Sequence, residues 1–495
     1  MFKRQKVPQL SIYDFITPFG GHLNGENRWV ITAEKMDWDY IDEVYEKAFK
    51  NKETGNVAYS SRIAFGSLYI QKKLGLTDEE TVEMIQENPY LQYFIGYKEY
   101  TYEKPFDSST LVYFRKRLPQ EVMNEINEHH FKDKAGGSGS NAGTSNETEI
   151  SSESSEKQNN SGTLIIDATC TPADIAYPTD LELCSKSREW TEDIFDYLYT
   201  TQGNFSGTNT KPRTYREVAR HRFLLLNKRS KKTAKKIRKE LRYQLNCIYR
   251  NLCYIMHYDL SKLPKIMVQR YFTIWEVYRQ QKEMLDEKKH YVKDRIVNLA
   301  QPWIRPIVRG KAKAKTEFGA KISISVVNGY TFLDRMSFDA YNEGDPEEFI
   351  LAVELYRKRF GCYPERILAD KIYRSRKNKA YCKEHGIRMS GPKLGRPKED
   401  NQEEIKQELR EIGERNEVEG KFGTGKRRYG LGLIKAKLQE TTQADIGMNL
   451  FVENMEHQIR EDLKSFSLAL FHKCYCTLEN LMHVLASGYE MGIIQ

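Results

Sequence analysis

The chain has 495 residues, of which 78 are Lys or Arg and 69 are Asp or Glu, so its formal net charge is +9. It contains no run of about 18 apolar residues, which argues against a transmembrane helix, and its basic N-terminus lacks the apolar stretch of a secretory signal. Eight scattered cysteines without a CxxC pair argue against a zinc site and fit a reduced, cytoplasmic protein.

The first part of the chain, residues 1–133, is expected to be helical. A capping box at residues 77–80 should begin one helix, and Asn88-Pro89 should end it. The other helices predicted in this part cover residues 36–49, 60–74 and 106–118.

The helix over residues 106–118 is predicted to bury its apolar residues and to carry Arg115, Lys116 and Arg117 largely outward. A compact helical unit with a basic last helix is typical of helix-turn-helix DNA binding, which makes Arg115 and Arg117 candidate DNA contacts. An ordinary helical bundle fits the same pattern, because basic helices are common.

Residues 134–162 are rich in Gly, Ser, Asn and Glu and nearly free of large apolar residues, which predicts a flexible linker. The short apolar run at 163–169 then predicts a central strand that is buried on both faces. Asp167 lies at the carboxyl end of this run, where an acid is costly to bury unless it is paired or functional. The alternative is that Asp167 caps the following turn.

From about residue 182 to residue 300 the pattern becomes helical and basic. Helices are predicted from about residue 228 and over residues 266–292, and Leu263-Pro264 would let them fold back as a hairpin. The density of cations favours a polyanion as partner, with a nonspecific basic patch as the alternative. The candidate DNA contacts in this cluster are Lys231, Lys232, Lys235 and Lys236.

The following sequence predicts a mixture of strands and helices. Asn328-Gly329 is a strong hairpin signal between two alternating segments. A helix should begin at Asp345-Pro346, and the short apolar strand at 366–370 ends in Asp370. Residues 431–495 are expected to be largely helical, and Phe466 to Leu470 with Leu478, Leu481 and Leu485 are predicted to pack as a closing helix.

A charged helix from about residue 399 carries Arg415, Glu419 and Lys426, spaced so that all three project roughly the same way. The simpler interpretation is a solvated helix with i,i+4 ion pairs. Three glycines between residues 420 and 425 weaken the helix, and if they break it, Glu417 becomes the competitor of Glu419.

The three acids could share one site. Because the ends of adjacent parallel strands meet at one sheet edge, Asp167 and Asp370 could lie side by side, and Glu419 could reach them from a covering helix. Three carboxylates without a counter-charge would repel one another, so a divalent cation is expected. Mg²⁺ suits a site built from oxygen ligands alone, and two such ions can support in-line attack at phosphorus.

These residues also resemble a known signature. Arg415-x3-Glu419-x6-Lys426 is similar to the Y-x2-R-x3-E-x6-K signature of a large group of DDE-type transposases of bacterial insertion sequences, with Ile412 in the place of the tyrosine. Asp370-Lys-Ile-Tyr373 is similar to the family's D-x-G-Y motif, with Ile372 in place of the glycine. Asp167-Ala-Thr169 is similar to the strand that carries the first Asp.

The resemblance implies an α/β fold with a ribonuclease-H-like catalytic core, a mixed sheet flanked by helices. Asp167, Asp370 and Glu419 would be catalytic and hold Mg²⁺, with Mn²⁺ as a substitute. Arg415, Lys426, Lys371 and Tyr373 would contact DNA. The partners would be double-stranded DNA, namely the terminal inverted repeats and the target, and a second copy in a homodimer, without a membrane or a small-molecule substrate.

The activity implied is cleavage of DNA phosphodiesters at the element's ends and joining of the 3′ hydroxyls to target DNA. A catalytically inactive DNA-binding protein on the same fold is the alternative, and the basic tracts disfavour a glycosidase with a carboxylate pair. The predicted organisation is an N-terminal helical domain (1–133), a linker (134–162), a catalytic core (163–181 and 301–455), a helical insertion (182–300) and C-terminal helices (456–495).

Overall fold

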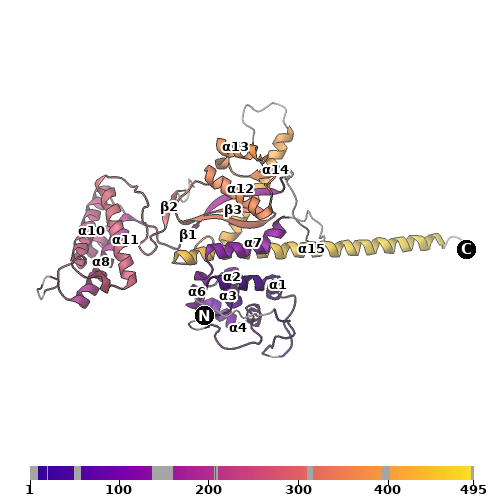
Figure 1. Ribbon diagram of the computed structural model, residues 1–495, viewed down its shortest axis with the longest axis horizontal. Helices are drawn as coiled ribbons and strands as arrows, with labels where there is room; N and C mark the ends of the chain where they lie inside the picture. The colour runs from indigo at the N-terminus through magenta and orange to yellow at the C-terminus, as the bar shows by residue number, and fades with distance from the viewer. Residues whose placement is uncertain are drawn as a thin grey trace, which may run out of the picture.

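The computed structural model describes residues 9–18, 20–49, 57–136, 160–205, 207, 210–308, 316–391 and 402–491, without the side chains of residues 402, 404, 405 and 468–491. A mixed α/β body lies above a group of N-terminal helices, a helical insertion projects to one side, and a long C-terminal helix projects to the other (Figure 1). The predicted linker falls almost wholly outside the described residues.

A mixed sheet forms the centre of the body. Its strand order is β2-β3-β1-β5-β6, and β4 also pairs with β3. The pairs β1–β5 and β5–β6 are parallel, whereas β3 is antiparallel to β1, β2 and β4. The strands are β1 (Thr163–Pro172), β2 (Arg305–Val308), β3 (Thr316–Val327), β4 (Tyr330–Ser337), β5 (Arg366–Leu368) and β6 (Arg388–Met389).

Local sequence signals account for several of these elements. Leu164, Ile165 and Ile166 of β1 are buried on both faces of the sheet, as predicted for a central strand. The β3–β4 turn places Asn328 and Gly329 at φ of 47° and 81°, the left-handed region that a tight hairpin requires. The predicted hairpin is therefore confirmed.

Helices cover both faces of the sheet. The helix predicted from Asp345-Pro346 is confirmed, because Pro346 occupies its first turn and Gly361, with φ of 76°, ends it. The apolar side chains of Val418 and Phe422 pack with β1 and β5 on the opposite face. The helices of this part are α12 (Pro346–Phe360), the 3-10 helix η2 (Lys371–Tyr373), α13 (Arg376–Glu384) and α14 (Gln402–Arg428).

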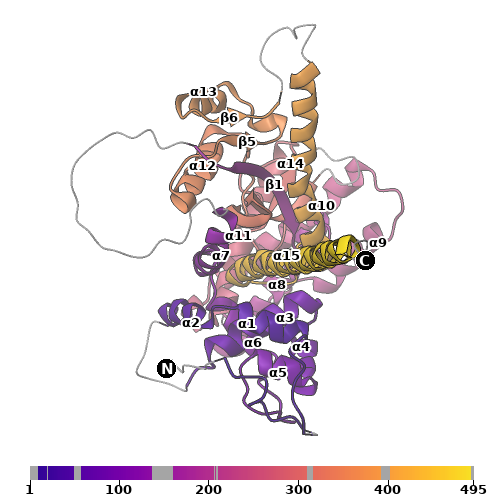
Figure 2. The same cartoon turned by 90° about the vertical axis from the view of Figure 1, so that its right-hand side faces the viewer.

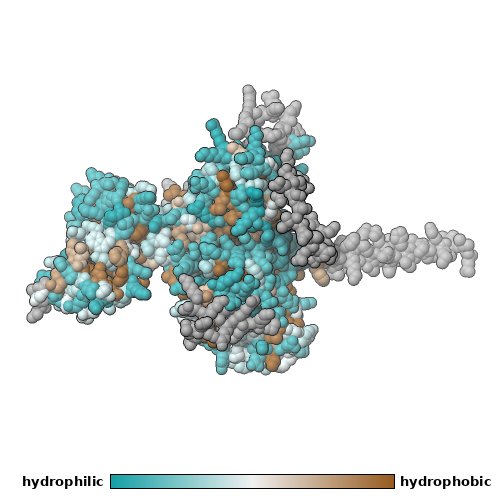
Figure 3. Space-filling model, viewed as in Figure 1, coloured by the Kyte–Doolittle hydropathy of each residue, from teal (hydrophilic) through white to brown (hydrophobic). Residues whose placement is uncertain are grey.

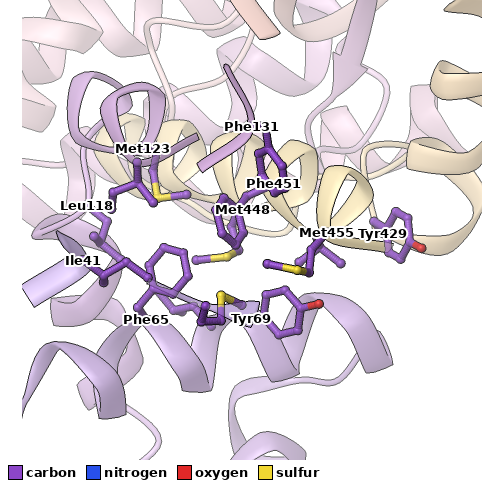
Figure 4. Packing of buried hydrophobic residues seen from close by; sticks show 14 of the residues in the cluster. Ile41, Phe65, Tyr69, Leu118, Met123, Phe131, Tyr429, Met448, Phe451 and Met455 are labelled. Atoms are coloured by element: carbon purple, nitrogen blue, oxygen red, sulfur yellow. The ribbon is translucent and has the colours of Figure 1, made fainter. Parts of the chain in front are cut away.

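The N-terminal helices share one hydrophobic core with the sheet. Their buried residues pack against α15, and the same cluster continues to Ile166 of β1 and Phe332 of β4. Figure 4 shows Phe65 and Tyr69 facing Met448 and Phe451 across this junction. Burial of each such side chain contributes about 1.5–3 kcal/mol. The helices are α1 (Arg28–Lys35), α2 (Trp38–Lys47), α3 (Ser61–Leu74), α4 (Asp78–Glu87), α5 (Pro89–Phe94), α6 (Thr110–Lys116) and α7 (Gln120–Gly136).

The helical insertion lies between β1 and β2 and has a hydrophobic core of its own. Its basic helix begins at Ala234, not at residue 228, because Thr233 takes the extended backbone conformation of an N-cap. Lys231 and Lys232 therefore precede the helix, whereas Lys235 and Lys236 lie in its first turn. The helices are α8 (Asp180–Gln202), α9 (Arg216–Asn227), α10 (Ala234–Ile255), the 3-10 helix η1 (Leu260–Lys262) and α11 (Lys265–Asp286).

The C-terminal region differs from the prediction. A single helix, α15 (Gln439–Met491), passes between the N-terminal helices and the sheet and then continues beyond the body (Figures 1 and 2). Phe466, predicted to pack within a closing helix, is 68% exposed. The expected packing of Phe466 is wrong, because the helix has already left the body at that point.

Candidate active site

Asp167, within β1, and Asp370, two residues beyond the end of β5, lie at matching positions on neighbouring parallel segments. The prediction that Asp167 ends its strand is wrong, because β1 continues to Pro172. Ile165 of β1 pairs with Leu368 of β5, and each aspartate follows two residues later. Neighbouring strands are about 4.8 Å apart, and side chains two residues apart share a face. Since Ile165 and Leu368 both pack beneath α14, the two aspartates begin on the same side of the sheet. The predicted juxtaposition of these two acids is supported by this register.

Each of the two aspartates uses one carboxylate oxygen for its own backbone. Asp167 Oδ1 accepts a hydrogen bond of 2.8 Å from the N–H of Ala168, and Asp370 Oδ1 accepts one of 2.7 Å from the N–H of Lys371. Within the described residues, neither Oδ2 atom has a protein hydrogen-bond donor. Both carboxylates thus keep an oxygen for an external ligand.

The environment of Asp167 disfavours its charged form. Burial raises the pKa of Asp167 above its usual value, and the negative charges of Asp370 and Glu343 raise it further. The guanidinium of Arg415 acts in the opposite direction. A cation that neutralises this group of acids would therefore be favoured at this position.

The helix α14 carries the third predicted acid. It is continuous from Gln402 to Arg428, so the glycines do not break it. Val418 and Phe422 bury its inner face, and Glu419 lies at the edge of that face, 59% exposed. Arg415 Nη2 lies 3.4 Å from Glu419 Oε1. Arg415 therefore connects Glu419 with the surroundings of Asp167.

The other end of this helix is fixed to β1 by Lys426. Its Nζ donates a hydrogen bond of 2.9 Å to Thr169 Oγ1, two residues beyond Asp167 on the same face of the strand. Arg415 and Lys426 thus lie along the helix face that borders the aspartates. Their contact with DNA phosphates stays a prediction.

The three acids do not form one compact group in this conformation. Among the residues that the structure describes, no three His, Cys, Asp or Glu side chains lie close enough together to hold a metal ion. Asp167 and Asp370 are neighbours, whereas Glu419 lies beside Arg415 on the covering helix. A shared metal site would require Glu419 to turn or move toward the aspartates.

The two predicted DNA contacts beside Asp370 differ in exposure. Lys371 is exposed. Tyr373, in contrast, is only 3% exposed and packs in the hydrophobic core, where burial and the charge of Asp167 raise its pKa. Tyr373 cannot stack on a nucleotide in this conformation, and sequence alone did not reveal this because η2 turns the ring inward.

Arg115 is not directed outward, so that prediction is wrong. Its guanidinium hydrogen-bonds to Asp78 at 3.1 Å and to Gln71 at 2.7 Å, and it lies 3.2 Å from Asp445 of α15. The predicted helix is shorter than expected, and Arg115 falls on its buried side. Arg117 is partly buried and lies over the Phe49 ring at 4.6 Å.

The four predicted lysines of the insertion are exposed. Lys235 and Lys236 belong to α10, and Lys232 Nζ donates a hydrogen bond of 2.7 Å to Asn227 Oδ1. Lys231 is exposed in the preceding loop. These residues belong to the helical insertion, which lies apart from the sheet (Figure 1).

Sequence reasoning missed the loop that supports Asp370. A Cβ added to Gly344 would lie 2.2 Å from the carbonyl oxygen of Ile372, so this loop packs directly on η2. The buried Asn378 donates hydrogen bonds to the carbonyl oxygens of Gly344 (3.1 Å) and Tyr373 (2.8 Å), which joins the two segments. Neither residue follows a strand, so the strand-end pattern gave no signal for them.

Two parts of the chain match known family models. Residues 367–456 match a family model described as transposase DDE domain, and residues 19–117 match one described as transposase domain (DUF772). The first match contains Asp370 and Glu419, whereas Asp167 precedes it.

One relative also matches part of the chain. Over 165 residues the chain is 30% identical to the "Uncharacterized protein ORF8 in nfe locus" of Rhizobium meliloti, an alignment that spans 33% of this chain and 71% of the relative. No solved structure matches the chain. Helices of the length and apolar character that a bilayer requires do not occur in the described part. The chain belongs to the insertion-sequence transposases that carry a DDE domain.

Proposed function

We propose that this transposase cuts DNA phosphodiesters at the ends of its element and joins the freed 3′ hydroxyls to target DNA. In this proposal Asp167, Asp370 and Glu419 hold two divalent cations. The observation that carries the proposal is that Asp167 and Asp370 lie at matching positions beside each other. Arg415 links this pair to Glu419, because it acts on the charge of Asp167 and lies 3.4 Å from Glu419.

The available ligands fit a hard divalent cation. The DDE transposase family depends on divalent metals. The three side chains offer only carboxylate oxygens, which suit Mg²⁺ and Mn²⁺ better than softer ions. When bound, such ions lower the pKa of an attacking water or hydroxyl and neutralise charge at the leaving oxygen. The raised pKa of Asp167 means that protons compete with a metal ion at this carboxylate.

Movement of Glu419 would cost little. An exposed i,i+4 ion pair such as Arg415–Glu419 contributes only about 0.3–0.5 kcal/mol. Its separation would free Glu419 for the metal site and Arg415 for a DNA phosphate. Bound DNA and metal could therefore complete the site, which is open in the protein alone.

The sheet topology supports a ribonuclease-H-like core. Three antiparallel strands, β4, β3 and β1, are followed by the parallel strands β5 and β6 on the other side of β1. This arrangement places Asp167, midway along β1, beside the carboxyl end of β5. Open α/β folds bind ligands outside the carboxyl ends of their strands.

The cations around this edge suggest how DNA is held. Arg415, Lys426 and Lys371 would contact phosphates near the cleavage point, since phosphate contacts position a duplex without reading its sequence. The insertion and the N-terminal helices would recognise the terminal inverted repeats. A homodimer would bring two element ends together.

Cleavage of the element's own ends by the purified full-length chain tests this function. We expect Mg²⁺- or Mn²⁺-dependent cleavage that Asp167→Asn abolishes while binding to the ends persists. The alternative, an inactive DNA-binding protein, predicts binding without metal-dependent cleavage in the unaltered chain. The absence of binding to any DNA would exclude both.

A further inference from the structure

Helix α9 of the insertion exposes large apolar side chains. Val218 is 51% exposed, Leu224 38% and Leu225 51%. Ala219 and Leu226, on the other side of the helix, are buried. We call Val218, Leu224 and Leu225 the apolar edge. Val218 and Leu225 are seven residues apart, so they lie one above the other on the helix surface.

Cations flank the apolar edge in the sequence, and Figure 3 shows that the surface of the insertion is largely hydrophilic with apolar patches. From residue 203 to residue 242 the chain has fourteen Lys or Arg and only two acids, Glu217 and Glu240. Glu240 is buried and paired with Arg222 at 3.1 Å. Within the described residues, the exposed cations near the edge in sequence have no acidic side chain at ion-pair distance. They form what we call the basic corner: Arg220, Lys228, Arg229, Lys231, Lys232, Lys235 and Lys236.

The positive charge of the basic corner indicates which partner binds the apolar edge. A second copy of the chain would bring two basic corners together, and like charges at close range repel. A polyanion is attracted instead, and duplex DNA combines anionic phosphates with apolar base faces. DNA-binding proteins insert Leu, Ile, Phe or Met side chains between base steps and thereby kink the duplex.

We propose that the apolar edge enters between base pairs of duplex DNA whose phosphates the basic corner holds, and that it bends this DNA. The inference rests on the proposed function, because it requires a DNA substrate. According to this inference, the insertion bends the duplex in addition to binding its phosphates. Such a device would unstack bases locally and let the DNA follow the insertion.

Energy transfer between dyes at the two ends of a duplex of about 30 mixed-sequence base pairs, long enough to hold one bend, tests the proposal. The full-length protein should bring the dyes closer, since wedges of this kind kink DNA by about 20–90°. The double variant Leu224→Ala/Leu225→Ala should bind with an unchanged dependence on salt but leave the duplex straight. We expect its affinity to fall roughly fivefold or more, because an inserted side chain adds contact area.

Two control variants separate the contributions. Ile266→Ala/Phe272→Ala removes exposed apolar side chains from α11 of the same insertion and should bend DNA as the unaltered protein does. Lys235→Ala/Lys236→Ala should reduce the slope of log affinity against log salt by about 2, because two phosphates would no longer be neutralised by a lysine. Because all these side chains are exposed, the melting temperatures should remain close to that of the unaltered chain.

Several results would overturn the proposal. Normal bending by Leu224→Ala/Leu225→Ala, or by the single variant Leu225→Ala if the double variant misfolds, would exclude the wedge. Loss of a dimer in these variants without DNA would assign the edge to a second copy. If the unaltered protein bound DNA without bending it, only this inference would fail. If it bound no DNA, the proposed function would fail as well.

Discussion

Lys426 Nζ donates a hydrogen bond of 2.9 Å to Thr169 Oγ1, and this contact joins the last turns of α14 to β1. Asp167 lies two residues before Thr169, and Arg415 lies about three helical turns before Lys426. The bond therefore adds to the packing of Val418 and Phe422 in holding α14 beside the aspartates. It also holds an ammonium group beside the edge where DNA is expected.

Variants of these two residues separate positioning from DNA contact. Lys426→Met should lower end cleavage by at least about tenfold, since it removes both the hydrogen bond and the charge at a phosphate. Thr169→Val should lower it much less, because the ammonium group remains. Cleavage rates at saturating protein provide the measurement. Equal losses in the two variants would mean that Lys426 acts only through Thr169.

The ionised carboxylate of Asp167 should lower the free energy of unfolding. Its raised folded-state pKa means that this cost is present above that pKa and disappears as the pH falls below the usual value of 3.8. Asp167→Asn, without metal, should therefore raise the melting temperature at pH 7, and the gain should shrink toward pH 4. Asp370→Asn is the control, since Asp370 is exposed and should change stability less. A lower melting temperature for Asp167→Asn at pH 7 would contradict this account.

The close approach of Gly344 to η2 predicts a steric effect on the site. Gly344→Ala places a Cβ 2.2 Å from the Ile372 carbonyl oxygen, so η2 must shift and carry Asp370 with it. We expect cleavage to fall while DNA binding persists. Gly413→Ala is the matched control, because its Cβ meets nothing within 4 Å, and within helix α14 it should add about 1 kcal/mol of stability. Unchanged cleavage by Gly344→Ala would show that this packing does not position Asp370.

The buried ion pairs of Asp445 should hold the N-terminal helices on α15. Asp445 lies 2.9 Å from Lys72 Nζ and 3.2 Å from Arg115 Nε. Asp445→Asn should cost about 3–5 kcal/mol, the usual range when one partner of a buried pair is removed. Asp462→Asn, at an exposed pair with Lys35, should change stability by at most about 1 kcal/mol. Chemical denaturation measures the free energy of unfolding of both variants. Equal losses in Asp445→Asn and Asp462→Asn would contradict the larger contribution of the buried ion pairs.

The same geometry predicts that Arg115 does not contact DNA. Arg115→Met should lower the free energy of unfolding, because it removes the ion pair with Asp78. At temperatures where the variant is folded, the salt dependence of its DNA affinity should be unchanged. If the slope of log DNA affinity against log salt concentration became smaller by about 1, Arg115 would be shown to bind a phosphate.

Local signals in the sequence predicted much of the fold and part of the site. Asp370 follows the short strand β5, and Asp167 follows a buried apolar run within β1, so their neighbouring positions could be inferred from pattern and topology. The hairpin at Asn328-Gly329 and the helix that begins at Pro346 have equally local causes. These elements form because neighbouring residues determine their backbone conformation.

The missed features depend on contacts between residues distant in sequence. Arg115 is buried because Asp78 and Asp445 surround it, and Asp445 belongs to a helix near the other end of the chain. Tyr373 turns into a core that α12 and the sheet create. The path of α15 depends on which of its residues meet the N-terminal helices. No local pattern reports such tertiary contacts.

The most direct test of the account is whether Glu419 shares metal ions with Asp167 and Asp370. Calorimetric titration of Mn²⁺ into the full-length chain bound to a duplex of the element's end measures this. We predict that Glu419→Gln, like Asp167→Asn and Asp370→Asn, weakens Mn²⁺ binding at least about tenfold, as removal of a metal ligand should, whereas Glu417→Gln leaves it unchanged. Unaltered Mn²⁺ binding by Glu419→Gln, or weakened binding by Glu417→Gln instead, would contradict the proposed site.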